Sequence, residues 1–472
     1  MNRKHTIAHS LVALLIGSMV ALGLDTARLE RQSVDLLIEG GITLTMNAAG
    51  QVFSDGLVAI RGDRIVAVGD RRELASRFSA ARVIDARGAA VMPGLINGHT
   101  HAAMSLFRGI ADDLVLQEWL TRYIFPAEAK NVTREFVYWG TLLACWEMIR
   151  GGTTTFVDMY YYESSVAKAV AQAGLRAILA ETILDLPSPD SRTPQLALQY
   201  TERFVAQWRG HPLIIPAIGP HAPYTNSTVT LRRVNRLAER LRIPIVMHVA
   251  ETETEVRDIT RRYGARPIRY LDEIGLLSPR LIAAHVVHVD EREIALLGRH
   301  HVGVIHNPQS NMKLASGIAP VPRMIRAGVA VGLGTDGAAS NNTLDMFEAM
   351  KTTALLHKVA TGDPRVLNAH QALALATIGG ARALHLEKEI GSLEPGKRAD
   401  VIVVGLDAPH QIPLYDVESQ LVYASRASDV RTVIINGRVV MRDGNLLTLD
   451  TAAIRIKANE FRDKVVKSLK AK

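Results

Sequence analysis

Cysteine is almost absent from this chain, with Cys145 as the one cysteine among 472 residues. An internal disulfide is therefore impossible, and no zinc-ribbon spacing exists. Cys145 lies in a run with helical character, residues 136–150. A free cysteine in such a run usually packs as a small hydrophobic group, so we expect a buried structural thiol.

Several motifs with strong functional meaning are also missing. The sequence contains no P-loop, no nucleophile elbow, and no Gly-x-Gly-x-x-Gly after its first strand-like run. The net charge of +8 could indicate nucleic acid or an anionic membrane, but the basic residues are dispersed except near the C-terminus. We therefore expect no nucleic-acid partner, and we expect residues 448–472 to form a basic C-terminal helix with one solvated face.

The first thirty residues differ from the rest. Arg3 and Lys4 precede an apolar run over residues 7–24, which is the order that a secretory signal or an uncleaved membrane anchor requires. This pattern predicts a periplasmic or secreted protein that touches the membrane only through this segment. The alternative is a start codon assigned too early, which would leave a cytoplasmic protein.

Short strand-like runs bounded by turn residues occur near both ends of the chain. This pattern predicts a small β-sandwich domain assembled from residues 31–90 and 390–447. Between them, residues 91–389 alternate apolar strands with helix-length segments. Eight strands are expected to end near His101, Asp158, Glu181, His221, His248, His285, His306 and Asp336. This α/β pattern predicts a (β/α)8 TIM barrel, whereas a doubly wound sheet would need the missing glycine motif.

Four metal-binding side chains stand at the ends of these runs, namely His99, His101, His248 and Asp336. Residues two apart in a strand point the same way, so His99 and His101 can bind one ion together. Barrel strands also place their carboxyl ends around one site. Three nitrogens and one carboxylate oxygen predict a single divalent ion, Zn²⁺ with Fe²⁺ as the alternative.

The longer motifs around these residues resemble the amidohydrolase superfamily. Within it, the chain is most similar to the 5'-methylthioadenosine/S-adenosylhomocysteine deaminases and their triazine-hydrolase relatives. The resemblance rests on PGLINGHTH (93–101), HVAET (248–252), AHVVH (284–288), HNPQSNMKL (306–314), GTDGAASNN (334–342) and SLEPGKRAD (392–400). It covers the chain from about Val34 to about Val440.

The resemblance implies an aminohydrolase mechanism. A bound ion would lower the pKa of a coordinated water to about 7, and Asp336 would take the proton of that water. Glu251 would donate a proton to a ring nitrogen of the substrate, and His285 would hydrogen-bond the nucleophile and the developing oxyanion. Relatives with two metals carry a lysine at the end of the fourth strand, but here that strand leads to His221, so one ion is expected.

The resemblance also suggests substrate contacts. Glu128 would bind the ribose hydroxyls, Trp119 would form a wall of the pocket, and His221 would reach the ribose side. Arg192 is the one remaining arginine candidate for the carboxylate of a homocysteine tail, because Glu181 stands where the family has an arginine. A carboxylate there would repel that tail, so neutral-tailed nucleosides are expected to be preferred.

Three hypotheses follow from these residues. The first is a metal-dependent deaminase of an adenine nucleoside, namely 5'-methylthioadenosine, adenosine or S-adenosylhomocysteine. The second is a hydrolase of another amino- or chloro-substituted ring, such as a triazine, guanine or pterin. The third is a non-catalytic barrel, which is disfavoured because the chain retains every ligand. Barrels of this kind are expected to form homo-oligomers.

Overall fold

An eight-stranded parallel sheet forms the centre of the protein, and the computed structural model describes residues 31–470 of it. The sheet order follows the chain from β8 to β15. The strands are β8 (Leu95–Thr100), β9 (Thr153–Tyr160), β10 (Arg176–Ile183), β11 (Ile214–Pro220), β12 (Ile245–Val249), β13 (Leu281–His285), β14 (Gly303–His306) and β15 (Ala330–Leu333). The segment after β15 returns to β8, because the Asp336 amide donates a hydrogen bond to the His99 carbonyl at 3.0 Å. The predicted (β/α)8 barrel is confirmed.

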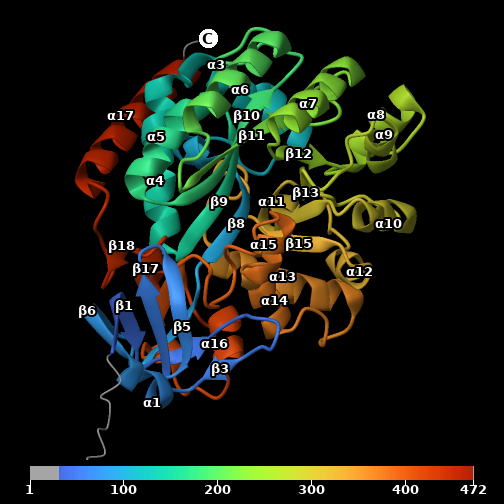
Figure 1. Cartoon of the computed structure of the whole chain (residues 1–472). Coiled ribbons are helices and arrows are strands. Elements are labelled where there is room, and N and C mark those ends of the chain that lie inside the picture. Colours follow the sequence, from blue (N-terminus) through green and yellow to red (C-terminus); the bar gives the residue numbers. More distant parts are fainter. Residues whose placement is uncertain (1–30, 471–472) are drawn as a thin grey trace, which may run out of the picture.

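Helices connect the strands and surround them (Figure 1). They are α4 (Arg134–Arg150), α5 (Glu163–Ala173), α6 (Pro194–Trp208), α7 (Thr228–Leu241), α8 (Glu253–Tyr263), α9 (Pro267–Glu273), α10 (Glu291–Arg299), α11 (Pro308–Lys313), α12 (Val321–Arg326), α13 (Met346–Thr361), α14 (Ala369–Leu375) and α15 (Ile378–Ala383). Inside the barrel, apolar side chains such as Ile96, Val157, Val246 and Ile305 form one cluster. The barrel is thus a packed core, and side chains for chemistry must stand at the strand ends. Cys145 on α4 is buried, and burial raises the pKa of its thiol, as expected for a structural cysteine.

Segments from the two ends of the chain share the smaller β structure. One sheet has the order β5-β4-β1-β6, and the other has the order β19-β18-β17-β16-β7-β2-β3. The N-terminal strand β7 (Ala89–Pro93) pairs antiparallel with the C-terminal strand β16 (Val401–Gly405). The remaining strands are β1 (Gln32–Glu39), β2 (Ile42–Leu44), β3 (Val52–Phe53), β4 (Gly56–Arg61), β5 (Arg64–Asp70), β6 (Phe78–Asp85), β17 (Val430–Ile435), β18 (Arg438–Arg442) and β19 (Asn445–Leu446). Sheets built from both terminal segments were expected, and they are observed.

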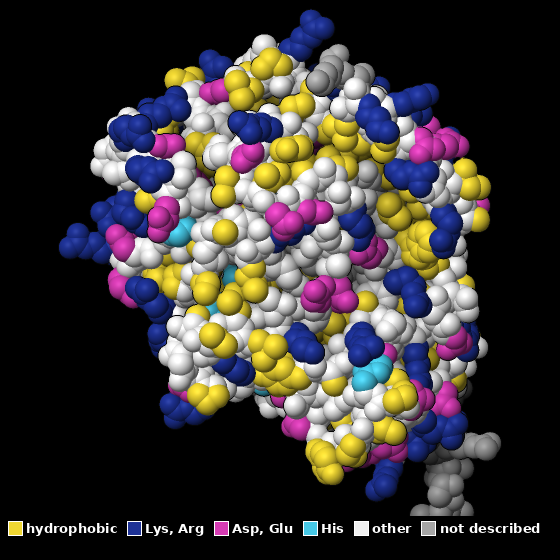
Figure 2. Space-filling view, turned by 180° about the vertical axis from the view of Figure 1, so that it is seen from behind, with side chains coloured by type: hydrophobic (Ala, Val, Ile, Leu, Met, Phe, Trp, Pro, Cys, Tyr) yellow, Lys and Arg dark blue, Asp and Glu magenta, His cyan; other side chains and the backbone are white. Residues whose placement is uncertain are grey.

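The C-terminal helix α17 (Thr451–Lys470) lies along the outside of the barrel (Figure 1). Its Phe461 ring meets Phe136 of α4 edge-on at 5.4 Å between centroids, while most of its lysines and arginines are exposed. On the face shown in Figure 2, Lys and Arg side chains are interspersed with Asp and Glu. Within residues 31–470, none of the helices combines the length and apolar character that a membrane crossing needs. The expected signal or anchor segment lies outside the described residues.

Candidate active site

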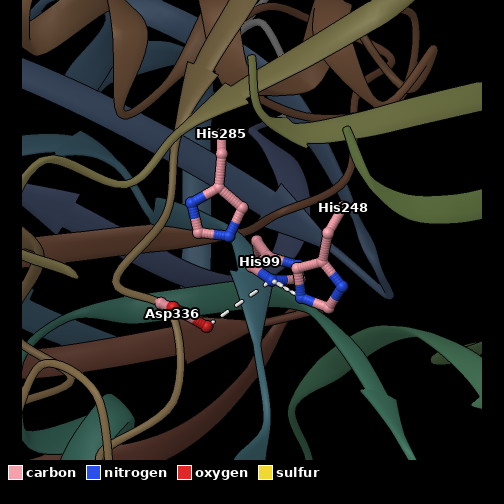
Figure 3. Close-up of side chains that lie close together, drawn as sticks. All are labelled: His99, His248, His285 and Asp336. Carbon is pink, nitrogen blue, oxygen red and sulfur yellow. Dashed lines mark hydrogen bonds and ion pairs between the residues drawn. The ribbon is translucent and has the colours of Figure 1, made fainter. Parts of the chain in front are cut away.

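Four candidate ligands converge at the carboxyl ends of the barrel strands. Nε2 of His248 lies 3.1 Å from Nε2 of His99 and 3.2 Å from Nε2 of His101. Oδ1 of Asp336 lies 3.2 Å from Nε2 of His101 and 3.5 Å from Nε2 of His99. Figure 3 shows His99, His248 and Asp336 directed toward one another. Groups from three distant parts of the sequence therefore share one small volume.

This spacing suits a divalent ion. Zinc binds imidazole nitrogen and carboxylate oxygen at roughly 2.0–2.2 Å, so tetrahedral ligand atoms stand about 3.3 Å apart. The four contacts among His99, His101, His248 and Asp336 span 3.1 to 3.5 Å. Two imidazole nitrogens at such distances repel each other through their lone pairs unless a proton or a cation lies between them. The set of three nitrogens and one oxygen therefore fits one zinc-like ion.

The other ring nitrogens of two histidines are held by backbone carbonyls. Nδ1 of His101 is 2.6 Å from the carbonyl oxygen of Met159, and Nδ1 of His248 is 2.8 Å from that of His221. Each Nδ1 therefore carries the proton and donates it, which leaves the Nε2 lone pair free for an ion. Burial lowers the pKa of His248 well below its usual value, which also favours the neutral ring.

Asp336 is fixed by hydrogen bonds that use both of its oxygens. Its Oδ1 accepts from the Gly337 amide at 2.8 Å, and its Oδ2 accepts from the hydroxyls of Ser310 at 2.6 Å and Ser340 at 2.9 Å. Burial works to raise the pKa of Asp336, but the surrounding histidines, His101 foremost, together hold that pKa well below the usual value. The Ser340 hydroxyl thus contacts the carboxylate of Asp336 directly, although Ser340 is not among the predicted site residues.

His285 stands beside this cluster. Ligand atoms of His99, His248, His285 and Asp336 all lie within 4.8 Å of one another, so geometry alone would allow His285 to be a ligand. The shorter contacts involve His101 instead. His285 places Nδ1 2.8 Å from Oδ1 of Asn311 and Nε2 3.8 Å from Oε2 of Glu251. It therefore bridges the metal-binding cluster and Glu251.

Glu251 is buried just after the end of β12, and it lines a cavity that is also lined by His285 and Asp336. Burial raises the pKa of its carboxyl, so the group keeps its proton to a higher pH than an exposed glutamate. Its backbone amide donates to Oε2 of Glu255 at 2.8 Å, and the Ala250 amide donates to Oε1 of Glu255 at the same distance. Glu255 thus fixes the backbone of Glu251. Glu255 is not among the predicted site residues, because its place in the sequence does not reveal this contact.

A cavity lies next to these groups. It is lined by eight of the predicted residues, namely His101, Trp119, Glu128, His221, His248, Glu251, His285 and Asp336. Glu128 accepts hydrogen bonds from the hydroxyls of Tyr160 at 2.8 Å and Tyr161 at 3.4 Å, and burial raises its pKa to about 7. The Trp119 indole N–H has no partner within residues 31–470. Both side chains can therefore offer polar atoms to a ligand.

Two residues expected near the substrate tail lie elsewhere. Arg192 is exposed and does not line the cavity. Glu181 is fully buried, and its Oε2 accepts from the Glu163 amide at 3.1 Å. Burial and the adjacent Asp190 raise the pKa of Glu181 well above its usual value. Glu181 does not line the cavity, whereas the adjacent Thr182 does. The carboxyl of Glu181 is therefore set back from the cavity surface, and its expected repulsion of a charged tail stays a prediction.

Comparison with known proteins agrees with this geometry. A model of the amidohydrolase family matches residues 90–440. The 5-methylthioadenosine/S-adenosylhomocysteine deaminase of Syntrophobacter fumaroxidans is 53% identical over 416 residues, which cover 88% of this chain and 95% of that protein. A crystal structure of an adenosine deaminase from Xanthomonas campestris with bound zinc is 42% identical, with a TM-score of 0.91 over 93% of this chain and 100% of that one.

A more distant structure shares the fold. Atrazine chlorohydrolase from Arthrobacter aurescens, complexed with zinc, has a TM-score of 0.83 at 23% identity, over 90% of this chain and 100% of that one. At this identity the likeness concerns the architecture alone. The family match and the identity to the Syntrophobacter protein both extend over most of the chain, so the resemblance seen in the motifs is confirmed. This chain belongs to the amidohydrolase family.

Proposed function

We propose that this chain is a metal-dependent aminohydrolase that deaminates an adenine nucleoside to the inosine form and releases ammonia. One observation carries the proposal. A buried carboxyl with a raised pKa, Glu251, faces the same cavity as Asp336, with His285 between them. A proton donor and a proton acceptor on one substrate are what hydrolytic deamination needs. The names of the relatives described above support a purine nucleoside as that substrate.

His99, His101, His248 and Asp336 would hold the ion. When bound, such an ion lowers the pKa of a coordinated water to about 7. Zinc is the proposed ion, with ferrous iron as the alternative, because imidazole and carboxylate ligands suit both. Backbone carbonyls accept from Nδ1 of His101 and of His248, which directs Nε2 of each ring toward the ion and supports this assignment.

The protein groups then move protons in a defined order. Asp336 accepts a proton from the attacking water, and Glu251 donates a proton to a ring nitrogen, which draws electrons from the carbon under attack. His285 hydrogen-bonds the oxygen that becomes negative. The proton on Asp336 passes to the amino group, which leaves as ammonia from the tetrahedral intermediate. The hydroxyl of that intermediate becomes the carbonyl of the inosine form, and its proton returns to Glu251. Glu128, His221 and Trp119 would hold the sugar and the base in the cavity.

An ammonia-release screen tests this proposal. We expect turnover of 5'-methylthioadenosine, adenosine or S-adenosylhomocysteine, with ultraviolet spectra changing to those of the inosine form and about one metal ion bound per chain. Guanine, melamine and a pterin are the comparison substrates. Turnover of free rings alone would instead support the second hypothesis, and a metal-loaded protein that releases no ammonia from any of them would contradict the proposal.

The tail of the nucleoside is expected to be neutral. A second hollow shares Phe125, Glu128 and Tyr161 with the main cavity. Its other lining residues are Ala129, Leu184, Leu186, Pro187, Ser188 and Pro189, so no lysine or arginine lines it. An apolar methylthio group can bury its surface there, whereas the charged end of a homocysteine tail would lose hydration without gaining a cationic partner. We therefore expect kcat/KM to be higher for 5'-methylthioadenosine than for S-adenosylhomocysteine.

Replacing Leu186 by Arg should reduce this preference. Leu186 is 55% exposed, so a new guanidinium would reach the tail in a partly solvated position. Such a pair contributes modestly, and relative use of S-adenosylhomocysteine should rise about twofold to fivefold. Leu186→Gln is the matched uncharged control. An unchanged ratio in Leu186→Arg, or a wild-type preference for S-adenosylhomocysteine, would show that the tail lies elsewhere.

Oligomeric state and export stay predictions. A homo-oligomer is expected, and size-exclusion chromatography with light scattering measures it. Export through residues 1–30 would place the enzyme in the periplasm or outside the cell, and N-terminal sequencing of protein from cell fractions tests for cleavage of that segment.

A further inference from the structure

A loop residue contacts the carboxyl oxygen of Glu251 that does not face His285. Ser316 lies between α11 and α12 and is 5% exposed. Its hydroxyl donates to Oε1 of Glu251 at 3.3 Å. This distance is long for an O–H···O bond, as is common for catalytic contacts before substrate binds. The other carboxyl oxygen, Oε2, faces His285 at 3.8 Å. The two oxygens of Glu251 therefore have different surroundings.

The backbone of Ser316 is held at both ends. Its amide donates to the Asn311 carbonyl at 2.8 Å, and its carbonyl accepts from Nε2 of His288 at 2.6 Å. The flanking residues adopt left-handed conformations, with φ of +53° at Ala315 and +125° at Gly317. Such a conformation persists only where surrounding contacts enforce it.

Gly317 shows how closely the loop sits on its support. A Cβ at this position would lie 3.0 Å from Cγ1 of Val287 and 3.3 Å from Nε2 of His288. The His288 amide in turn donates to the Ala250 carbonyl at 2.9 Å, one residue before Glu251. His288 is thus tied to the Glu251 segment through its backbone and to Ser316 through its ring. His288 therefore connects the loop to the segment that carries Glu251.

We propose that Ser316 is a positioning residue for Glu251 and that His288 acts through Ser316. This inference rests on the proposed function. The Ser316 hydroxyl occupies Oε1 as a donor, so the carboxyl proton must reside on Oε2, the oxygen on the side of His285. If the carboxyl of Glu251 could rotate freely, its proton would face the ring nitrogen of the substrate only part of the time. His288 keeps the Ser316 carbonyl in place and thereby keeps the hydroxyl aimed at Oε1.

Kinetics of Ser316→Ala test the first part. We expect kcat to fall about tenfold, the usual effect of losing one hydrogen bond, while KM changes less than about twofold. Metal content and Tm should match the wild type. Ser316→Thr retains the hydroxyl and should recover most of the lost rate. A wild-type kcat in Ser316→Ala would overturn the proposal.

A double-mutant cycle tests whether Ser316 acts through Glu251. In a Glu251→Gln background, measured with enzyme in excess over nucleoside, Ser316→Ala should cause no further loss. Likewise, His288→Ala should lower kcat about as much as Ser316→Ala. The double variant Ser316→Ala/His288→Ala should be no slower than either single variant. His288→Gln should retain activity, because glutamine also offers an N–H donor. Equal losses in both Glu251 backgrounds would assign Ser316 a general structural role. A wild-type enzyme without deaminase activity would instead refute the proposed function, so the two failures are distinguishable.

Discussion

Replacing Glu251 by Gln is expected to lower kcat for an adenine nucleoside by about 10²- to 10⁴-fold, the usual contribution of a general acid. Glutamine has the same shape and can still accept the Ser316 hydrogen bond, but it cannot transfer a proton. The side chain is not among the proposed metal ligands, so bound metal should remain at the wild-type amount. Ammonia release and elemental analysis of the same preparation measure both quantities.

The matched control is Glu253→Gln. Glu253 is exposed in the first turn of α8, two residues from Glu251 and outside the main cavity. Glu253→Gln makes the same carboxyl-to-amide replacement in the same segment and should leave kcat within about twofold, as for most surface substitutions. Near-normal turnover in Glu251→Gln would remove the acid role from this residue. Equal losses in both variants would point to a general sensitivity of this segment to carboxyl-to-amide replacement.

The pH dependence of the wild type follows from the same carboxyl. The pKa of Glu251 is raised by burial, so its protonated form persists to a higher pH than that of an exposed glutamate. If Glu251 is the acid, the rate declines as pH rises through this raised pKa. The raised pKa also affects folding: the contribution of this group to the free energy of unfolding is fully present at low pH and is lost as pH rises through the folded-state pKa.

The barrel and the metal-binding cluster were predictable because both depend on local patterns. Apolar strands ending in His99, His248 or Asp336 show the positions where parallel strands present their carboxyl ends. No information on contacts across the fold was needed for this step. His285 followed the same rule, although its backbone is left-handed with φ of +72°, a detail that no strand pattern contains.

The sequence could not show the direction and the hydrogen-bond partners of side chains that lie beyond the strand ends. Glu181 and Thr182 are adjacent on β10, yet Thr182 faces the cavity and Glu181 packs behind it against the segment that begins α5. Sequence spacing did not tell which of the two points inward. Ser316 lies 65 residues from Glu251, so only the fold brings them together. Such contacts across the structure cannot be read from a motif.

Removing the metal ion is expected to abolish activity and to lower Tm. An ion that binds only the folded chain adds to the free energy of unfolding, by about 4 kcal/mol at a thousandfold excess over Kd. Without it, the Nε2 atoms of His99 and His248 stand 3.1 Å apart and lose their shared partner. Treatment with dipicolinate should therefore produce an inactive protein with a lower Tm. Adding Zn²⁺ or Fe²⁺ back separately should restore both, and the better ion identifies the native metal.

His248→Ala should reproduce the metal-free state, with kcat lower by about a thousandfold or more because the metal-dependent step is lost. The exposed His370, paired with Glu418 at 2.8 Å, provides the control His370→Ala. The His370→Ala variant should bind metal normally and keep full activity. Wild-type metal content in His248→Ala would mean that His285, whose ligand atom lies within 4.8 Å of the others, completes the site. In that case His285→Ala in the His248→Ala background should release the ion, and the roles of these two histidines would be exchanged.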